Sequence, residues 1–385
     1  MKNYLVTGGA GFIGANLVRE LLKKQDIKPG ASPMGDGSTS SPRARQLDPL
    51  ILSLSKDRPE PVEGCEFQKR SNIFLIVEKN TDLWRLQDVL EYINFVDADL
   101  TNYEQLANQI QIIKPEVIFH LAAFGGLPNQ LNQKLIFDVN FYGTVNLLNA
   151  CKQVGFDCFI NTGSSSEYGF KDQQMREDDV LHPVSDYGVA KAAATQFCLK
   201  EALFNELSVY TVRPFAVYGD YEMPGRLIPS ILVNALQDKQ INLSSPNFVR
   251  DFIYVKDFVD FCIQLSVMQP DQQFVFNAGT GVQSTIKYVV KTVQTIVQRP
   301  LDICWGASVP RPWEPKVWQA NIDRAKELLG WTPKYSLKDG LTESLNWFEK
   351  NINFYVKEYE KKSGSNIFAK TTFVSSGKAD QVNNS

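Results

Sequence analysis

The sequence predicts an α/β fold built on a doubly wound parallel sheet. Short apolar runs typical of buried strands alternate with helical patterns through the first two thirds of the chain. The expected strands are 4–7, 74–77, 117–121, 159–162 and 209–212. The segment 13–24 is the clearest expected helix, because its leucines and valines recur on one face. This alternation predicts helices on both faces of one sheet.

Composition excludes several kinds of function. The 385 residues carry a net charge of -3 with both signs interspersed, so we expect neither a nucleic acid nor a membrane as a partner. The six cysteines form no C-x-x-C pair, and several lie in apolar runs, which argues against a disulfide framework. With only His120 and His182, a histidine-rich metal site and a Ser/His/Asp hydrolase are both disfavoured, and no metal is expected.

The expected location is the cytoplasm. A strand pattern begins within three residues of Met1, without the charged and apolar regions of a signal peptide. No apolar stretch reaches the roughly 18–20 residues that are needed to cross a bilayer.

The sequence YLVTGGAGFIG places Gly8, Gly11 and Gly14 between the first strand and the first helix. Glycines allow a tight turn, a close approach of the backbone to a pyrophosphate and close packing of helix on strand, and the helix N-terminus offers free N–H groups. The position of the motif predicts a Rossmann-like, dinucleotide-binding domain at residues 1–212. Residues 213–350 are then a smaller C-terminal α/β domain that mainly binds substrate.

Two segments depart from this plan. Residues 26–72 are rich in Pro, Gly, Ser and Arg where a connection of a few residues is usual, and we predict a disordered or loosely packed insertion. A lid over the site is the alternative. Residues 363–385 are predicted to be a disordered tail.

Several later segments fit the same groove for the dinucleotide. Asp99 and Leu100 follow a strand-like run, Ala122 and Ala123 end another strand, and Asn140 opens a helix. Each segment alone is equally typical of a helix cap or of packing. Glu78 follows the second strand, where an acid holds the ribose hydroxyls and favours NAD. Lys79 and Arg85 can offset that charge, so NADP stays possible.

The chemistry is predicted at Tyr187 and Lys191, whose spacing puts both side chains on one helical face. A neighbouring ammonium brings the pKa of a tyrosine down from about 10 toward neutrality, so the phenol can exchange a proton while a nicotinamide exchanges a hydride. Ser164, 23 residues earlier, follows a strand and can hydrogen-bond the reacting oxygen. A polar turn is the alternative for this serine-rich segment.

The ordered motifs TGGAGFIG, HLAA, GSSSEYG, Y-x-x-x-K, RPFAVYG, RDFIYVKD and LLGWTP resemble those of the extended short-chain dehydrogenase family of nucleotide-sugar epimerases, dehydratases and 4-keto reductases. The resemblance implies that Ser164, Tyr187 and Lys191 are catalytic. It implies a nucleotide-sugar substrate, with substrate-binding residues Ser165, Ser166, Arg226, Arg250 and Arg311. The cofactor-binding residues are then Gly8, Gly11, Phe12, Ile13, Gly14, Glu78, Asp99, Leu100, Ala122, Ala123, Asn140, Thr162, Tyr187 and Lys191.

Two departures from the family pattern bear on the reaction. Ser165 and Ser166 stand where dehydratases have an Asp-Glu pair, with Glu167 one place too late, which disfavours dehydration. Ala216 replaces an asparagine that is frequent in the family. We therefore expect a 4-keto sugar reductase or a C4-epimerase, with reduction slightly ahead. The alternatives are a dehydratase and a catalytically silent dinucleotide-binding module. A homodimer is expected through helices near 101–113 and 187–203.

Overall fold

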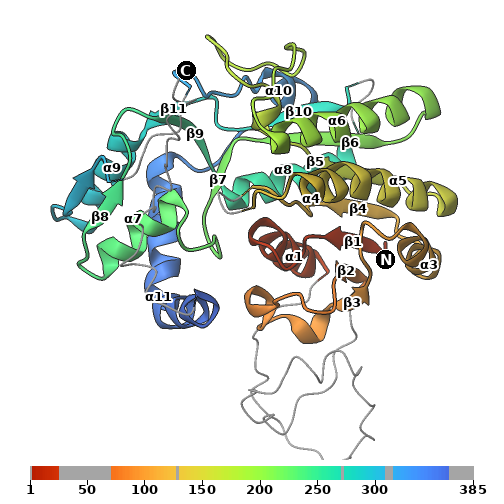
Figure 1. Cartoon of the computed structure of the whole chain (residues 1–385), viewed down its shortest axis with the longest axis horizontal. Coiled ribbons are helices and arrows are strands. Elements are labelled where there is room, and N and C mark those ends of the chain that lie inside the picture. Colours follow the sequence, from red (N-terminus) through yellow and green to blue (C-terminus); the bar gives the residue numbers. More distant parts are fainter. Residues whose placement is uncertain (1, 26–70, 127–129, 270–272, 308–314, 364–385) are drawn as a thin grey trace, which may run out of the picture. The chain divides into compact units, whose positions relative to one another are not determined.

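The computed structural model describes residues 2–25, 71–126, 130–269, 273–307 and 315–363, with side chains up to residue 357 (Figure 1). Residues 26–70 of the predicted insertion and the predicted tail from residue 364 lie outside the described residues. Two compact units emerge: Met1–Glu167, Pro183–Val212 and Cys262–Val275 form the first, and Tyr168–His182, Arg213–Phe261 and Phe276–Ser385 the second. Within the described ranges, every helix is too short or too polar to cross a membrane.

A seven-stranded sheet has the order β10-β6-β5-β4-β1-β2-β3, and its strands from β5 to β3 lie in the first unit. Neighbouring strands from β3 to β6 all run parallel, which confirms the predicted Rossmann-like fold class. The strands are β1 Tyr4–Thr7, β2 Ile73–Val77, β3 Asn94–Asp97, β4 Val117–His120, β5 Cys158–Thr162, β6 Val209–Pro214 and β10 Val275–Ala278.

Helices follow the strands of the first unit in the order that the sequence pattern indicates. The α-helices are α1 Phe12–Lys24, α3 Tyr103–Ile113, α4 Gln133–Phe137, α5 Gly143–Val154, α6 Asp186–Asn205 and α8 Val255–Met268, the last of which runs on from the second unit. Short 3-10 helices occupy Trp84–Leu86, Leu90–Tyr92 and Ser165–Glu167, and a π-helix occupies Asp138–Tyr142.

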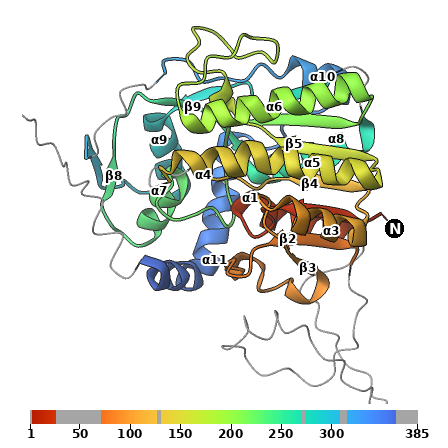
Figure 2. The same ribbon diagram turned by 45° about the vertical axis from the view of Figure 1, so that its right-hand side comes forward.

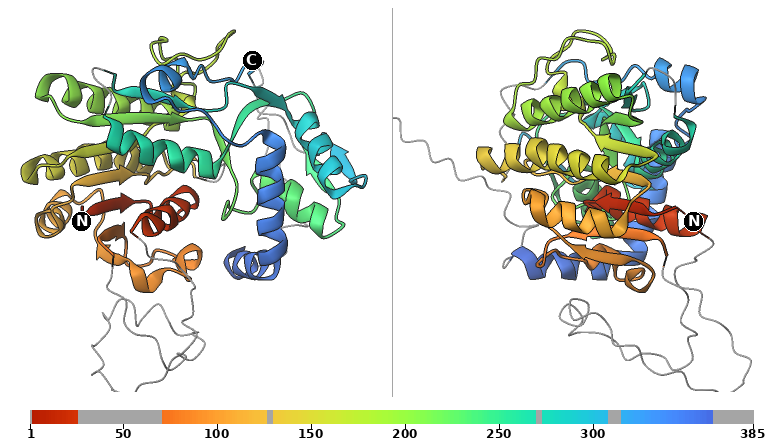
Figure 3. Two further views of the ribbon diagram at one scale, coloured as in Figure 1. Left: turned by 180° about the vertical axis from the view of Figure 1, so that it is seen from behind. Right: turned by 90° about the vertical axis from the view of Figure 1, so that its right-hand side faces the viewer.

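The continuous apolar character of the strands reflects burial of both sheet faces. Every residue of β4 and β5 is buried, as expected for central strands of a covered parallel sheet. One face packs against α3, α5 and α6 through a cluster that includes Leu106, Leu147 and Cys198 (Figure 2). Figure 3 shows α1 on the other face, where Leu17 and Leu21 are buried.

The last two residues of the predicted insertion belong to the folded unit. The N–H of Tyr4 donates to the carbonyl oxygen of Asn72 at 2.8 Å, and the N–H of Ser71 donates to that of Tyr92 at 2.9 Å. These bonds fix the start of β2 beside β1.

Smaller sheets organise the second unit. One has the order β11-β9-β7 and the other pairs β12 with β8. Its further strands are β7 Ala216–Tyr218, β8 Ile241–Leu243, β9 Val249–Tyr254, β11 Gln283–Thr285 and β12 Ile303–Trp305. Its further helices are α7 Leu227–Leu236, α9 Ile286–Val297, α10 Asp323–Leu329 and α11 Leu337–Ser363.

Candidate active site

The glycine-rich turn after β1 brings two backbone segments into contact. Gly8 has a φ of +67°, and a Cβ there would lie 2.6 Å from the backbone nitrogen of Ala122. A Cβ on Gly14 would lie 2.3 Å from the carbonyl oxygen of Gly8. Any larger residue would force the turn away from the end of β4. Gly11 is the N-cap of α1, so the helix starts at Phe12 and Ile13 with its first N–H groups beside the turn.

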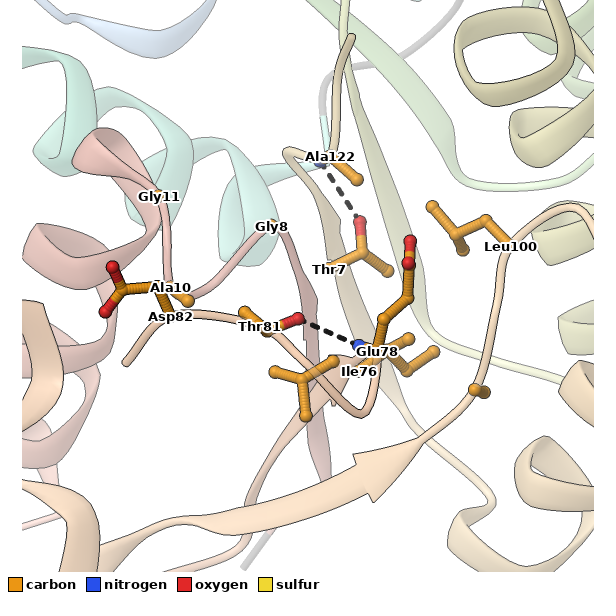
Figure 4. A pocket seen from close by; sticks show the side chains of 12 residues that line it. Thr7, Gly8, Ala10, Gly11, Ile76, Glu78, Thr81, Asp82, Leu100 and Ala122 are labelled. Atoms are coloured by element: carbon orange, nitrogen blue, oxygen red, sulfur yellow. Dashed lines mark hydrogen bonds between the residues drawn. The ribbon is translucent and has the colours of Figure 1, made fainter. Parts of the chain in front are cut away.

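A cavity of about 260 Å³ lies next to this turn. Five predicted cofactor residues line it, namely Gly8, Gly11, Glu78, Leu100 and Ala122. Figure 4 shows the Glu78 side chain reaching into the space that Leu100 also borders. The lining residues that the sequence argument missed are Thr7, Ala10, Ile76, Val77, Thr81, Asp82 and Ala98.

Local hydrogen bonds shape the walls of the cavity. The Glu78 N–H donates to the Thr81 hydroxyl at 3.0 Å, which turns the chain directly after β2. The Ala122 N–H donates to the Thr7 hydroxyl at 3.3 Å. Arg85, a possible counter-charge for Glu78, instead stacks on Trp84, with its guanidinium carbon 4.3 Å from the ring centroid.

Nine of the fourteen predicted cofactor residues do not line this cavity, among them Asp99 and Ala123. Asp99 accepts hydrogen bonds from the N–H and the hydroxyl of Thr101, both at 2.8 Å, so its carboxylate caps the turn before α3. Ala123 is exposed, one residue beyond the lining residue Ala122. The roles of Asp99 and Ala123 stay predictions.

Asn140 holds the loop that follows β4. Its side chain is fully buried at the centre of the π-helix and bonds to both backbone polar groups of Phe124. Next to it, His120 is buried between the hydroxyls of Thr7 and Thr144, at 2.7 and 2.9 Å. Burial, together with the charge of the nearby Lys191, lowers the pKa of His120 to about 3, so the imidazole is neutral.

Tyr187 lies in the first turn of α6, where Ser185 is the N-cap and accepts from the Gly188 N–H at 3.1 Å. A Cβ at Gly125 would be 3.5 Å from a ring carbon of Tyr187. One turn later, Lys191 is 1% exposed and its ammonium donates to the Thr162 carbonyl oxygen at 2.8 Å. The structure thus places Lys191 against the end of β5, with Tyr187 one turn earlier on the same helix.

Burial sets the protonation of Lys191. It lowers the pKa of the ammonium to about 8, while the charge of Glu167 acts in the opposite direction. The Thr162 hydroxyl is buried and has no hydrogen-bond partner in the described part of the chain. A bound ligand can satisfy it.

Ser164 begins a short loop whose shape depends on Glu167, which was not among the predicted site residues. Its N–H donates to the Glu167 carboxylate at 2.8 Å, and its hydroxyl oxygen accepts from the Ser166 N–H at 3.1 Å. Glu167 also accepts from the Thr195 hydroxyl at 3.0 Å. The signal was available, because Thr195 continues the Tyr187 and Lys191 spacing by one more helical turn.

Arg250 and Arg226, two of the arginines predicted to bind substrate, belong to the second unit. Arg250 lies in β9 and donates to the Val249 carbonyl oxygen at 2.7 Å, with its guanidinium carbon 5.4 Å from the Trp318 ring centroid. Arg226 is the N-cap of α7 and is 3.8 Å from the Glu222 carboxylate. Arg311 lies outside the described residues.

Asp251, the residue after Arg250, ties two later chain segments to β9. Its buried carboxylate accepts from the N–H groups of Thr280, Gly281 and Ala320 at 2.8 to 3.1 Å and from the Thr280 hydroxyl at 2.6 Å. Successive residues of a strand point to opposite faces, so this anchor holds the backbone from which Arg250 projects.

The model of the NAD dependent epimerase/dehydratase family matches residues 4–279. The chain belongs to this family. Its NAD dependence agrees with the predicted cofactor, and the resemblance to extended short-chain dehydrogenases is confirmed.

The alignments with similar proteins cover nearly the whole length of each relative. A UDP-glucuronate 4-epimerase of Thermodesulfobacterium geofontis is 25% identical, with 91% of this chain and 98% of the relative covered. A UDP-glucose 4-epimerase of Rhizobium meliloti is 27% identical, with 90% and 97% covered. The dTDP-glucose 4,6-dehydratase of Bacillus anthracis, solved in complex with NAD, is 25% identical with a TM-score of 0.70 and covers 93% of this chain and 99% of its own.

Proposed function

We propose that this epimerase/dehydratase family member interconverts C4 epimers of a nucleotide-linked sugar, using NAD. The observation that carries the proposal is the placement of Tyr187, Lys191 and Ser164 in the unit that holds the glycine-lined cavity. The relatives whose names specify 4-epimerases support the position of the reaction on the sugar.

The residues around the cavity fit a dinucleotide. The glycine turn and the N-terminus of α1 would hold the pyrophosphate, and Glu78 would accept hydrogen bonds from ribose hydroxyls. The Lys191 ammonium and the Thr162 hydroxyl, which has no hydrogen-bond partner among the described residues, lie at the end of β5 and would face the remainder of the dinucleotide. Bound NAD supplies an acceptor for the hydride of the sugar carbon and returns it.

Each catalytic side chain then has one task. Tyr187 takes the proton of the C4 hydroxyl as the C4–H bond breaks, and gives the proton back when the ketone is reduced on its other face. The Lys191 ammonium stabilises the phenolate. The Ser164 hydroxyl donates a hydrogen bond to the sugar oxygen. We assign Arg250 and Arg226 to the diphosphate, which suits the guanidinium group, together with Arg311.

Dehydration is not the proposed reaction. Elimination of water needs an acid and a base beside the ring, but Ser165 and Ser166 supply no carboxyl group. The carboxylate of Glu167 is fully buried and is occupied by Ser164 and Thr195. It is held within the protein as a structural acceptor.

Reduction of a 4-keto sugar is the second candidate, because the segment GSSSEYG that contains Ser164 resembles the corresponding segment of deoxysugar reductases. The same three catalytic residues serve both reactions. The difference is whether the 4-keto intermediate turns in the site and whether the cofactor is exchanged after each turnover.

The experiment compares the two cofactor regimes. Purified protein is incubated without added cofactor with UDP-glucose, UDP-galactose and UDP-glucuronate, and the sugars are followed by proton NMR. In parallel, nucleotide-linked 4-keto-6-deoxy sugars are supplied with NADH and absorbance at 340 nm is followed. Interconversion of C4 epimers without added cofactor supports epimerisation. Stoichiometric NADH oxidation instead establishes reduction. If the wild type shows neither activity, the proposal is wrong.

A further inference from the structure

Glu167 connects two elements of the candidate active site. Its carboxylate, with no exposed surface, receives the N–H of Ser164 from the loop after β5 and the hydroxyl of Thr195 from α6. A second close contact joins the same elements, since a Cβ on Gly188 would lie 2.7 Å from the Ser166 carbonyl oxygen. The loop and the helix are therefore fixed against each other near Glu167.

Thr195 places this anchor on the catalytic face of α6. Tyr187, Lys191 and Thr195 follow one another at intervals of four residues, so their side chains lie in one row along the helix. Lys191 donates to Thr162 at the end of β5, and Thr195 donates to Glu167 just beyond it. Two consecutive turns of α6 thus bind the same end of the same strand.

Lys191 is a buried cation that needs a counter-charge. Its hydrogen-bond acceptor, the Thr162 carbonyl oxygen, is neutral, and taking an ammonium out of water without an anion is costly. In the described part of the chain, the titratable groups beside it are Glu167 after β5, His120 at the end of β4, and Tyr187 and Cys198 on α6 itself. His120 is neutral, and burial raises the pKa of Cys198 to about 12. Glu167 remains as the carboxylate of this group.

We propose that Glu167 is a positioning residue that fixes the Ser164 loop on α6 and provides the buried negative charge that keeps Lys191 in its ammonium form. It acts through Ser164 and Lys191 and does not touch the substrate. Within this proposal, only the catalytic importance of Lys191 rests on the proposed function. The test therefore measures the protonation of Lys191 directly and requires no activity assay.

The test titrates Lys191 in the protein without added cofactor. The protein is produced with ¹³Cε-labelled lysine, and the resonance of Lys191 is identified by its loss in Lys191→Arg. Its chemical shift is followed from pH 6 to 11. Glu167→Gln keeps an acceptor oxygen and removes the charge, so the titration midpoint should fall by about one pH unit or more. An unchanged midpoint overturns the proposal.

Two control variants separate charge from structure. Glu201→Gln removes another buried carboxylate of α6, one that is paired with Lys152 and Lys200, and should leave the midpoint of Lys191 in place. Thr195→Val removes one hydrogen bond of Glu167 but keeps the charge of Glu167. In this variant the titration midpoint of Lys191 should stay within a few tenths of a pH unit of the wild type. A shift in either control as large as that of Glu167→Gln contradicts a specific charge pairing.

A second variant covers loss of folding. If Glu167→Gln is insoluble, the double variant Glu167→Gln/Lys191→Met removes both charges. Recovery of soluble, folded protein supports the charge pairing, because breaking a buried pair is worse than removing it. If the double variant is also insoluble, Glu167 is required for a reason other than the charge of Lys191, and the proposal is wrong.

Discussion

Asn140 binds Phe124 through both polar atoms of its side-chain amide. Nδ2 donates to the Phe124 carbonyl oxygen at 2.6 Å, and Oδ1 accepts from the Phe124 N–H at 3.1 Å. A π-helix around Asn140 provides the extra residue that widens the turn. The Asn140 amide therefore supplies the hydrogen-bond partners of the Phe124 backbone, which lies beyond the end of β4 and, among the described residues, has no neighbouring strand to bond.

Asn140→Asp should lower the free energy of unfolding by at least about 2 kcal/mol, because an acceptor then faces the Phe124 carbonyl in a buried position. Chemical denaturation measures the loss. Asn146→Asp is the matched control, since half-buried Asn146 makes one bond from Nδ2 to the Leu100 carbonyl, at 2.9 Å. Equal losses in both variants would show that Asn140 has no special role.

Tyr187→Phe should lower turnover by a factor of about 100 or more, the scale of lost acid-base catalysis, whichever reaction the assay identifies. Calorimetric NAD affinity and the melting temperature should stay close to the wild type, because Tyr187 is only half-buried. The exposed Tyr142→Phe is the control and should keep full activity. Near-normal turnover in Tyr187→Phe would show that another group moves the proton.

Glu78 should make NAD bind at least about tenfold more tightly than NADP, because a carboxylate in the cavity repels a 2'-phosphate and tenfold corresponds to only about 1.4 kcal/mol. Fluorescence titration with both cofactors tests this. Glu78→Ala should narrow the ratio, whereas exposed Glu91→Ala should leave it unchanged. A wild type that binds NADP as tightly as NAD contradicts the assignment.

Glu222 should make the protein less stable as the pH rises. Burial raises the pKa of this carboxyl from 4.5 to about 8, although Arg226 lowers it in part. Between these values the folded chain binds a proton that the unfolded chain releases, so stability falls from pH 4.5 to 8. Melting temperatures at pH 5.5 and 8.5 should fall less in Glu222→Gln than in the wild type. Exposed Glu349→Gln should follow the wild type.

The expected homodimer can be tested at the helices near 101–113 and 187–203. Ile112, Val189 and Leu203 are 76%, 40% and 55% exposed on these helices, which suits burial in an interface. Light scattering at micromolar concentration should give twice the chain mass, and Val189→Glu should reduce it. A monomeric wild type would exclude this arrangement.

The sheet was predictable because fully buried parallel strands leave continuous apolar runs. The expected strands of residues 4–7 and 209–212 match β1 at both ends and β6 at its start. The glycine turn was equally readable, since Gly8 and Gly14 each stand where a Cβ would strike backbone. These signals are local, and so they survive in a single sequence.

Contacts between distant residues left weaker signals. Glu167 was compared only with the Asp-Glu pair of dehydratases, from which it is offset by one position. Its hydrogen-bond partner Thr195 is 28 residues away, so the sequence did not indicate their contact. Asp251 was not singled out because its donors come from two later segments. Both carboxylates accept hydrogen bonds from backbone N–H groups. Every residue except proline has such a group, so the sequence does not show which ones are the donors.

The sheet order described above also bears on how the chain is made on the ribosome. β10 pairs with β6, and the Thr211 N–H donates to the Phe274 carbonyl oxygen at 2.7 Å, yet the two strands are separated by roughly 60 residues. At about 5–20 residues per second, synthesis of that stretch takes roughly 3–12 s. Throughout that time β6 is a bare edge of a growing sheet, open to pairing with another nascent chain. The interval is thus the period in which the β6 edge is open to aggregation during synthesis.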